Sequence, residues 1–122
     1  MLFSKTTVLA AAAAFSGLVQ GATITVAVGK GGLKFTPAEI TAKQGDRIIF
    51  EFYPGGHSVA ESTFDKPCEA LMGSSSFYSG IFPGANPPKD SFTIEIKDNG
   101  PIWFFCPTTG HCEAGMSGVI NG

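Results

Sequence analysis

Apolar and polar residues alternate at several places along the chain, and this alternation is the first guide to the fold. A repeat of two residues is typical of a β-strand that buries one face. It marks four stretches, residues 23–28, 35–43, 47–53 and 91–97. Residues 102–106 are apolar on both faces, as expected of a central strand, and residues 118–121 close the set. We therefore expect an all-β fold, a sandwich of two sheets that bury these apolar faces between them.

The stretch from residue 58 to residue 90 has no sustained period and is rich in glycine, proline and serine. We expect it to be a long irregular segment, with at most a short helix within residues 61–71. Its large apolar side chains are predicted to pack on the sheet; they are Phe64, Phe77, Tyr78, Ile81 and Phe82. Part of the segment should then cover Trp103 and Phe105. Met72 is interpreted as a core residue.

Residues 1–21 have the composition of a secretory signal peptide. Lys5 supplies a positive charge, residues 8–19 form an apolar core, and residues 19–21 form a cleavage site of the small-residue type. A membrane anchor is the alternative, but the apolar run is short for a bilayer span and no other stretch is long enough. Nor does the chain end in the tail of a lipid-anchor signal. We expect a secreted, extracellular protein with one domain at residues 22–122, present as a monomer.

The charge of this domain limits its partners. Without Lys5 it has seven basic and ten acidic residues, a net charge of about −3. It contains no basic run, so nucleic acid is not an expected partner. The whole chain contains 16 glycines and 8 prolines, a content typical of a β protein with many turns.

Potential metal ligands gather between residues 103 and 120. Cys106, His111 and Met116 are separated by four residues each, on a loop between two apolar strands. A thiolate, an imidazole and a weakly bound thioether suit copper, given one more imidazole. The only other histidine, His57, lies in a glycine–proline loop directly after the strand at residues 47–53.

The pattern Cys-x4-His-x4-Met, with Cys112 directly after the histidine and Gly115 before the methionine, resembles the copper loop of phytocyanin-type and plastocyanin-like cupredoxins. The stretch KFTPAEITAKQGDRIIFEF, followed by GGHSV, is also similar to the first half of a cupredoxin. The resemblance runs from about residue 22 to the end of the chain and is strongest to the small secreted cupredoxin-like proteins of fungi.

This resemblance implies a Greek-key β-sandwich with the irregular segment between the first ligand loop and the last strands. It implies one type 1 (blue) copper ion held by His57, Cys106, His111 and Met116. The function that follows is secreted one-electron transfer by Cu(I)/Cu(II) cycling, to an unknown extracellular redox partner. His111 would be the exposed electron port, and Ser58 would brace the ligand loops.

The chain has three cysteines, an odd number, so one of them is unpaired. The resemblance implies a Cys68–Cys112 disulfide, which leaves Cys106 for the metal. A Cys106–Cys112 or a Cys68–Cys106 bridge remains the alternative, and either would destroy the metal site.

Other uses of these residues also remain open. Zinc takes cysteine and histidine, but a structural zinc site normally has four strong ligands, and a thioether is a poor one. A multicopper oxidase needs many histidines, and this chain has two, so we do not expect an enzyme. The main rival to electron transfer is an extracellular protein that holds or delivers copper without a dedicated redox partner. A wall or surface module in which the metal matters little is a third reading.

Overall fold

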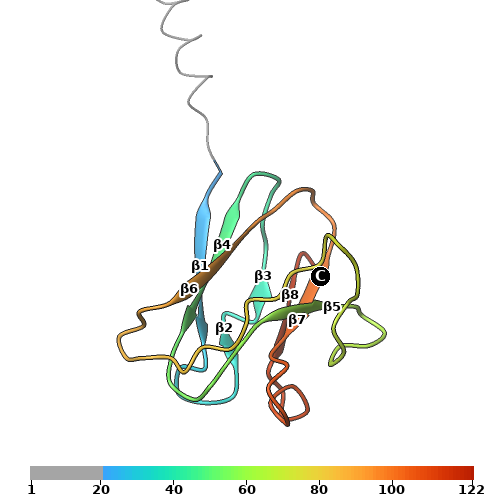
Figure 1. Ribbon diagram of the computed structural model, residues 1–122. Helices are drawn as coiled ribbons and strands as arrows, with labels where there is room; N and C mark the ends of the chain where they lie inside the picture. The colour runs from blue at the N-terminus through green and yellow to red at the C-terminus, as the bar shows by residue number, and fades with distance from the viewer. Residues whose placement is uncertain (1–20) are drawn as a thin grey trace, which may run out of the picture.

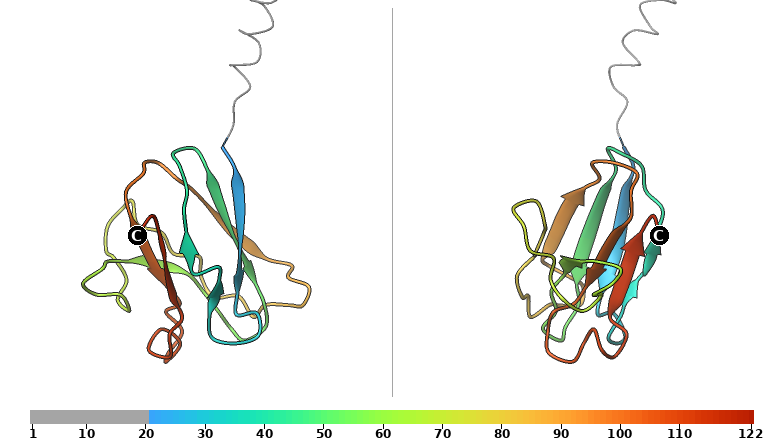
Figure 2. Two further views of the ribbon diagram at one scale, coloured as in Figure 1. Left: turned by 180° about the vertical axis from the view of Figure 1, so that it is seen from behind. Right: turned by 90° about the vertical axis from the view of Figure 1, so that its right-hand side faces the viewer.

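The computed structural model describes residues 21–122, and the predicted signal peptide lies outside the described residues but for its last position. Two four-stranded sheets pack face to face. Figures 1 and 2 show the two layers, with the irregular segment wrapped around one side. The predicted all-β sandwich is confirmed.

Each sheet contains one parallel pair of strands and two antiparallel pairs. The first sheet has the order β2 (Phe35–Thr36), β1 (Thr23–Val28), β4 (Arg47–Phe52), β6 (Ser91–Glu95), with β1 and β4 parallel. The second has the order β3 (Glu39–Ile40), β8 (Ser117–Ile120), β7 (Ile102–Phe105), β5 (Ala60–Ser62), with β3 and β8 parallel. β7 is an inner strand, as its two apolar faces predicted.

The core consists of the inward side chains of the alternating strands. Val26 and Val28 of β1 are fully buried, and so are the three inward residues of β4. At the centre, the ring of Phe104 from the second sheet meets the rings of Phe35 and Phe50 from the first, edge to face, with centroids 4.9 Å and 5.3 Å away. This geometry is favourable for aromatic pairs and locks the two layers together.

Residues 35–43 do not form the single strand that was predicted. They divide into β2 and β3, which belong to different sheets. Pro37 stands between them, and because proline has no N–H to donate, the ladder of β2 cannot continue through it. The chain thus crosses from one layer to the other, and Ile40 and Ala42 are both buried.

Two aspartates hold turns through hydrogen bonds to the backbone. Asp46 Oδ1 accepts a hydrogen bond from the Ala22 N–H and Oδ2 accepts one from the Lys43 N–H, both at 2.8 Å. These two hydrogen bonds stabilise the carboxylate and hold the pKa of Asp46 below its ordinary value of 3.8, and the bond from Lys43 has the larger effect. Asp98 accepts from the Gly100 N–H at 2.8 Å.

The long segment after β5 is held by backbone hydrogen bonds rather than by a helix. No helix occurs within residues 21–122, so the short helix considered within residues 61–71 does not form. Instead, residues 77–82 run antiparallel to residues 57–61, as the bonds Ser79 N–H to Val59 O (2.9 Å) and Glu61 N–H to Phe77 O (3.0 Å) show. The described residues also offer no helix long and apolar enough to cross a bilayer.

Several apolar side chains of this segment face solvent instead of the sheet. Phe77 and Phe82 pack against the core, but Phe64, Tyr78 and Ile81 are 70%, 55% and 64% exposed. Met72 is 85% exposed and is not a core residue. The two inner faces of the sandwich are already filled by strand residues, so these side chains have no core to enter.

The predicted cover over β7 is present. Phe105 is buried in a cluster with Ala60 of β5, Cys68 of the segment and Cys112 of the ligand loop. Trp103 is half-buried, with the ring of Phe64 at a centroid distance of 5.1 Å.

Candidate metal centre

The candidate ligands lie on two loops at the same end of the sandwich. One loop follows β4 and carries His57; the other joins β7 to β8 and carries the remaining three residues. Both loops are at the bottom in Figure 1, the second drawn in orange to red. The two loops come from different sheets, so the packing of the layers decides whether the ligands meet.

Three of the four predicted ligands come together as a compact donor group. The donor atoms of His57, Cys106 and His111 all lie within 4.8 Å of one another. The two imidazole rings have their centroids 5.1 Å apart, and Cys106 Sγ is 3.5 Å from His111 Nδ1. His57 and Cys106 are buried, and His111 is half-buried, so one edge of the group faces solvent.

The imidazole of His57 is oriented by backbone on one edge. Its Nε2 lies 3.2 Å from the carbonyl oxygen of Pro54. Because a carbonyl can only accept, this bond places the ring proton on Nε2 and leaves Nδ1 with a free lone pair. His57 Nδ1 is buried and has no hydrogen-bond partner. A buried polar atom without a partner is costly, and a metal ion beside it would satisfy it.

Two glycines give this ring its space. A Cβ on Gly29 would lie 2.1 Å from His57 Nε2, and one on Gly55 would lie 2.5 Å from the same atom. Any side chain at either position would therefore displace the imidazole. Both glycines also have positive φ angles, +78° and +135°, which other residues rarely adopt.

Cys106 is the one cysteine outside a disulfide, and it is fully buried. The backbone N–H of Ser58 donates to Cys106 Sγ at 3.5 Å. Such a donor stabilises the negative charge of a thiolate, which is the form that binds metals. Ser58 therefore touches the site through its backbone, while its own hydroxyl is buried without a partner.

Met116 closes the ligand loop and is also fully buried. The Cys106 N–H donates to its carbonyl oxygen, and its own N–H donates to the carbonyl oxygen of His111, both at 3.1 Å. The backbone of Met116 is thus bonded to both of the other candidate ligands on the loop.

The two ligand loops are also joined to each other and to the long segment. Thr108 Oγ1 donates to the carbonyl oxygen of Gly56 at 3.0 Å, directly before His57. Cys68 and Cys112 form a disulfide, which ties the long segment to the residue next to His111. Neither of the alternative cysteine pairings occurs.

The electrostatics favour neutral imidazole at His57. Burial of the ring has the largest effect on the pKa of His57 and lowers it below its ordinary value of 6.5. The nearby His111 lowers this pKa further, whereas the hydrogen bond to Pro54 raises it by a smaller amount. Neutral imidazole is the form that coordinates a metal.

The arrangement fits copper better than zinc. It offers two imidazoles and one thiol with a buried thioether on the same loop, and no carboxylate belongs to the group. A trigonal His2Cys set with a weak thioether is typical of blue-copper sites, whereas a closed zinc site needs a fourth strong ligand. No other group of three or more histidine, cysteine or acidic side chains within residues 21–122 could hold a metal.

The sequence pattern did not reveal Gly29, Pro54 or Thr108 as parts of the site. The one signal available was the density of glycine near His57, and Gly29 is separated from that histidine by the whole of β4.

Comparison with known proteins gives one family. A family model described as a plastocyanin-like domain matches residues 36–116. An "Extracellular serine-rich protein" of Arthroderma benhamiae is 41% identical over 111 residues, which cover 90% of this chain and 43% of that protein. A "Probable GPI-anchored cupredoxin-1" of the same organism is 37% identical over 109 residues, covering 88% and 55%. The chain thus spans about half the length of these curated relatives.

Solved structures show the same fold. Spinach plantacyanin aligns with a TM-score of 0.59 and 20% identity, covering 83% of this chain and 99% of that one. Reduced auracyanin from the photosynthetic bacterium Roseiflexus castenholzii aligns with a TM-score of 0.61 and 18% identity, covering 84% and 97%.

Proposed function

The chain belongs to the plastocyanin-like (cupredoxin) family, and from this premise we propose that it is a secreted one-electron carrier rather than an enzyme. Family membership together with a His, Cys, His and Met donor set indicates a single type 1 copper ion as the cofactor. The observation that carries the proposal is the compact, largely buried group of three donor atoms within 4.8 Å of one another.

In this proposal His57 and His111 supply imidazole nitrogens, Cys106 supplies the thiolate, and Met116 is the weak fourth ligand. Bound copper supplies a one-electron couple between Cu(I) and Cu(II). The task of the protein is then to keep the donors in one arrangement in both states.

Three features of the chain serve that task. The Pro54 carbonyl fixes the tautomer and orientation of His57. The Thr108–Gly56 hydrogen bond and the Cys68–Cys112 disulfide restrain the two loops. The burial of Cys106 and Met116 keeps water from the sulfur atoms. His111 is the proposed electron port, because it is the one member of the donor group that is partly exposed.

Reconstitution with Cu(II) tests the metal assignment. We expect one copper ion per chain, an intense visible thiolate-to-copper band and a narrow type 1 EPR signal. Cys106→Ser should remove the band. Met72→Leu is the control for the thioether, because Met72 is 85% exposed and should leave the spectrum unchanged. A copper complex whose band survives Cys106→Ser would contradict the assignment.

A second measurement separates electron transfer from copper handling. A carrier should give a reversible potential and fast electron self-exchange between Cu(I) and Cu(II) protein. A copper handler should instead exchange electrons slowly and give up its copper readily to an acceptor, and that result would refute the carrier role.

Secretion is proposed from residues 1–21 and fits the extracellular naming of one relative. The expected mature chain begins at Ala22. Mass spectrometry of the protein from the culture medium checks this, and recovery only inside the cells would contradict it.

A further inference from the structure

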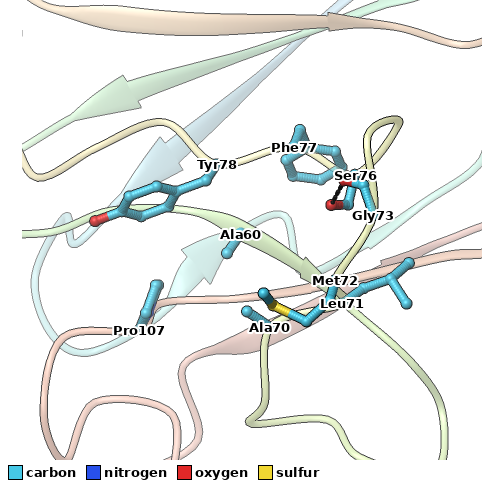
Figure 3. A pocket seen from close by; sticks show the side chains of 9 residues that line it. All are labelled: Ala60, Ala70, Leu71, Met72, Gly73, Ser76, Phe77, Tyr78 and Pro107. Carbon is cyan, nitrogen blue, oxygen red and sulfur yellow. Dashed lines mark hydrogen bonds between the residues drawn. The ribbon is translucent and has the colours of Figure 1, made fainter.

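A hollow separate from the metal centre lies against the loop that carries Cys106, His111 and Met116. It has a volume of about 340 Å³. Its lining comes from the long segment, from β5 and from the residue after Cys106: Ala60, Ala70, Leu71, Met72, Gly73, Ser76, Phe77, Tyr78 and Pro107 (Figure 3). No charged side chain is among them.

The hollow has two unlike walls. In Figure 3 the aromatic side chains Phe77 and Tyr78 lie along one side, and the side chains of Ala70, Met72 and Pro107 lie along the other, with Ala60 between them. Apart from Tyr78, Ser76 is the only residue of the lining with a hydroxyl group. Its Oγ already donates a hydrogen bond to the Gly73 carbonyl at 2.8 Å. An aromatic wall facing a thioether and aliphatic wall suits a flat apolar ring.

Backbone hydrogen bonds hold both walls in place. The Leu71 N–H donates to the Glu61 carbonyl at 2.7 Å, and the Glu61 N–H donates to the Phe77 carbonyl at 3.0 Å. The nearby Cys68–Cys112 disulfide restrains the segment further. The hollow is therefore formed before any ligand arrives, so binding need not order the segment.

Large apolar side chains of this lining are exposed to solvent, and a bound ligand would cover them. Met72 is 85% exposed and Tyr78 is 55% exposed, although both could bury apolar surface if a ligand lay between them. The volume of about 340 Å³ lies within the range of small-molecule sites.

We propose that this pocket, defined by the nine residues above, binds a small, flat, uncharged aromatic molecule such as a phenol. The absence of charged side chains in the lining disfavours an ionic ligand, because its charge would lose water without gaining a partner. Binding needs neither copper nor electron transfer, so the proposal stands or falls separately from the proposed function.

The test uses the Cu(I)-loaded protein with 1-naphthol as the probe, followed by ¹H–¹⁵N NMR and calorimetry. We expect a Kd on the order of 0.1 mM, within the limits for a ligand of this size. The shifted amide signals should be those of residues 70–78 and 60. The charged analogue 1-naphthalenesulfonate should bind at least tenfold more weakly.

Three variants locate the site. Ala70→Phe places a ring in the pocket from an exposed position, and should weaken naphthol binding at least tenfold. Tyr78→Ala removes part of the aromatic wall and should also weaken naphthol binding. Ile81→Ala is the matched control, because Ile81 is 64% exposed on the same segment but does not line the pocket, and its Kd should stay within twofold of wild type.

Retained unfolding midpoints would show that each variant is folded. The proposal is overturned if naphthol does not bind, if Ile81→Ala weakens binding as much as Ala70→Phe, or if the sulfonate binds equally well. It is also overturned if sedimentation shows a dimer that Ala70→Phe dissociates, because the pocket would then be covered by a second copy of the chain.

Discussion

Gly29 offers the sharpest test of how the backbone holds the metal centre. It follows β1 directly and is not a candidate ligand, yet a Cβ at this position would lie 2.1 Å from His57 Nε2 and 2.3 Å from Cδ2. An ordinary contact begins near 3.4 Å, so in Gly29→Ala the ring must move by roughly 1.3 Å. Such a shift breaks the 3.2 Å hydrogen bond between Nε2 and the Pro54 carbonyl.

The expected loss follows from that bond. Removing a partner that orients a metal-binding histidine typically reduces metal affinity 10–100-fold. We therefore expect Gly29→Ala to bind Cu(I) 10–100-fold more weakly than wild type and to shift or weaken the visible band of the Cu(II) form. A competition titration against a Cu(I) chelator measures the affinity.

Gly31→Ala is the matched control. Its φ of +76° is nearly that of Gly29, but an added Cβ there meets nothing within 4 Å. An alanine at either position must adopt a left-handed backbone conformation, which lowers the free energy of unfolding by about 1 kcal/mol. Urea titration of the metal-free protein measures this loss. Only Gly29→Ala should lose copper affinity. If the two variants had the same affinity and spectrum, the proposed role of Gly29 would be wrong.

Three further predictions concern stability and potential. The Cys68→Ala/Cys112→Ala variant should lose about 4 kcal/mol of unfolding free energy in urea, the chain-entropy value for a disulfide that spans a sequence separation of 44; an unchanged midpoint would contradict it. Met116→Gln should lower the reduction potential measured by voltammetry, because a thioether favours Cu(I) more than an amide oxygen does; a potential that does not fall would refute Met116 as a ligand. Asp46 has a lowered pKa in the folded protein, so its contribution to stability is present above pH 4 and lost as the pH falls below it. Asp46→Asn should therefore be less stable than wild type at pH 7, with the gap narrowing at pH 3; a gap of equal size at both pH values would count against this.

The sequence predicted the strands and core well because these depend on local pattern. An alternating strand such as β4 buries every second residue whichever strand it pairs with, so its inner face could be read without knowing the sheet order. The same holds for the ligand loop, where Cys106, His111 and Met116 lie within the one short connection between β7 and β8.

Contacts between distant residues were the part that could not be predicted. The His57 ring fits only because Gly29 and Gly55 have no side chains. These two glycines lie before and after β4 in the sequence, and no periodicity links their positions. The hydrogen bond from Thr108 to Gly56 depends in the same way on how two loops from different sheets face each other. Such contacts follow from the packing of the layers, which the alternation pattern leaves open.

The long segment shows most clearly why apolar content alone misleads. Its large apolar side chains were predicted to pack on the sheet, and Phe77 and Phe82 do so, but Phe64, Tyr78 and Ile81 face solvent. The space between the sheets is already filled, with Phe104 packed against two rings of the opposite layer. Another part of the segment covers Phe105 of β7, where Ala60 and Cys68 pack in one cluster with it. The remainder, including Met72 and Tyr78, is left exposed around a hollow. Because Cys68 is bonded to Cys112 beside His111, the disulfide joins the segment that lines the hollow to the loop that carries three of the candidate metal ligands.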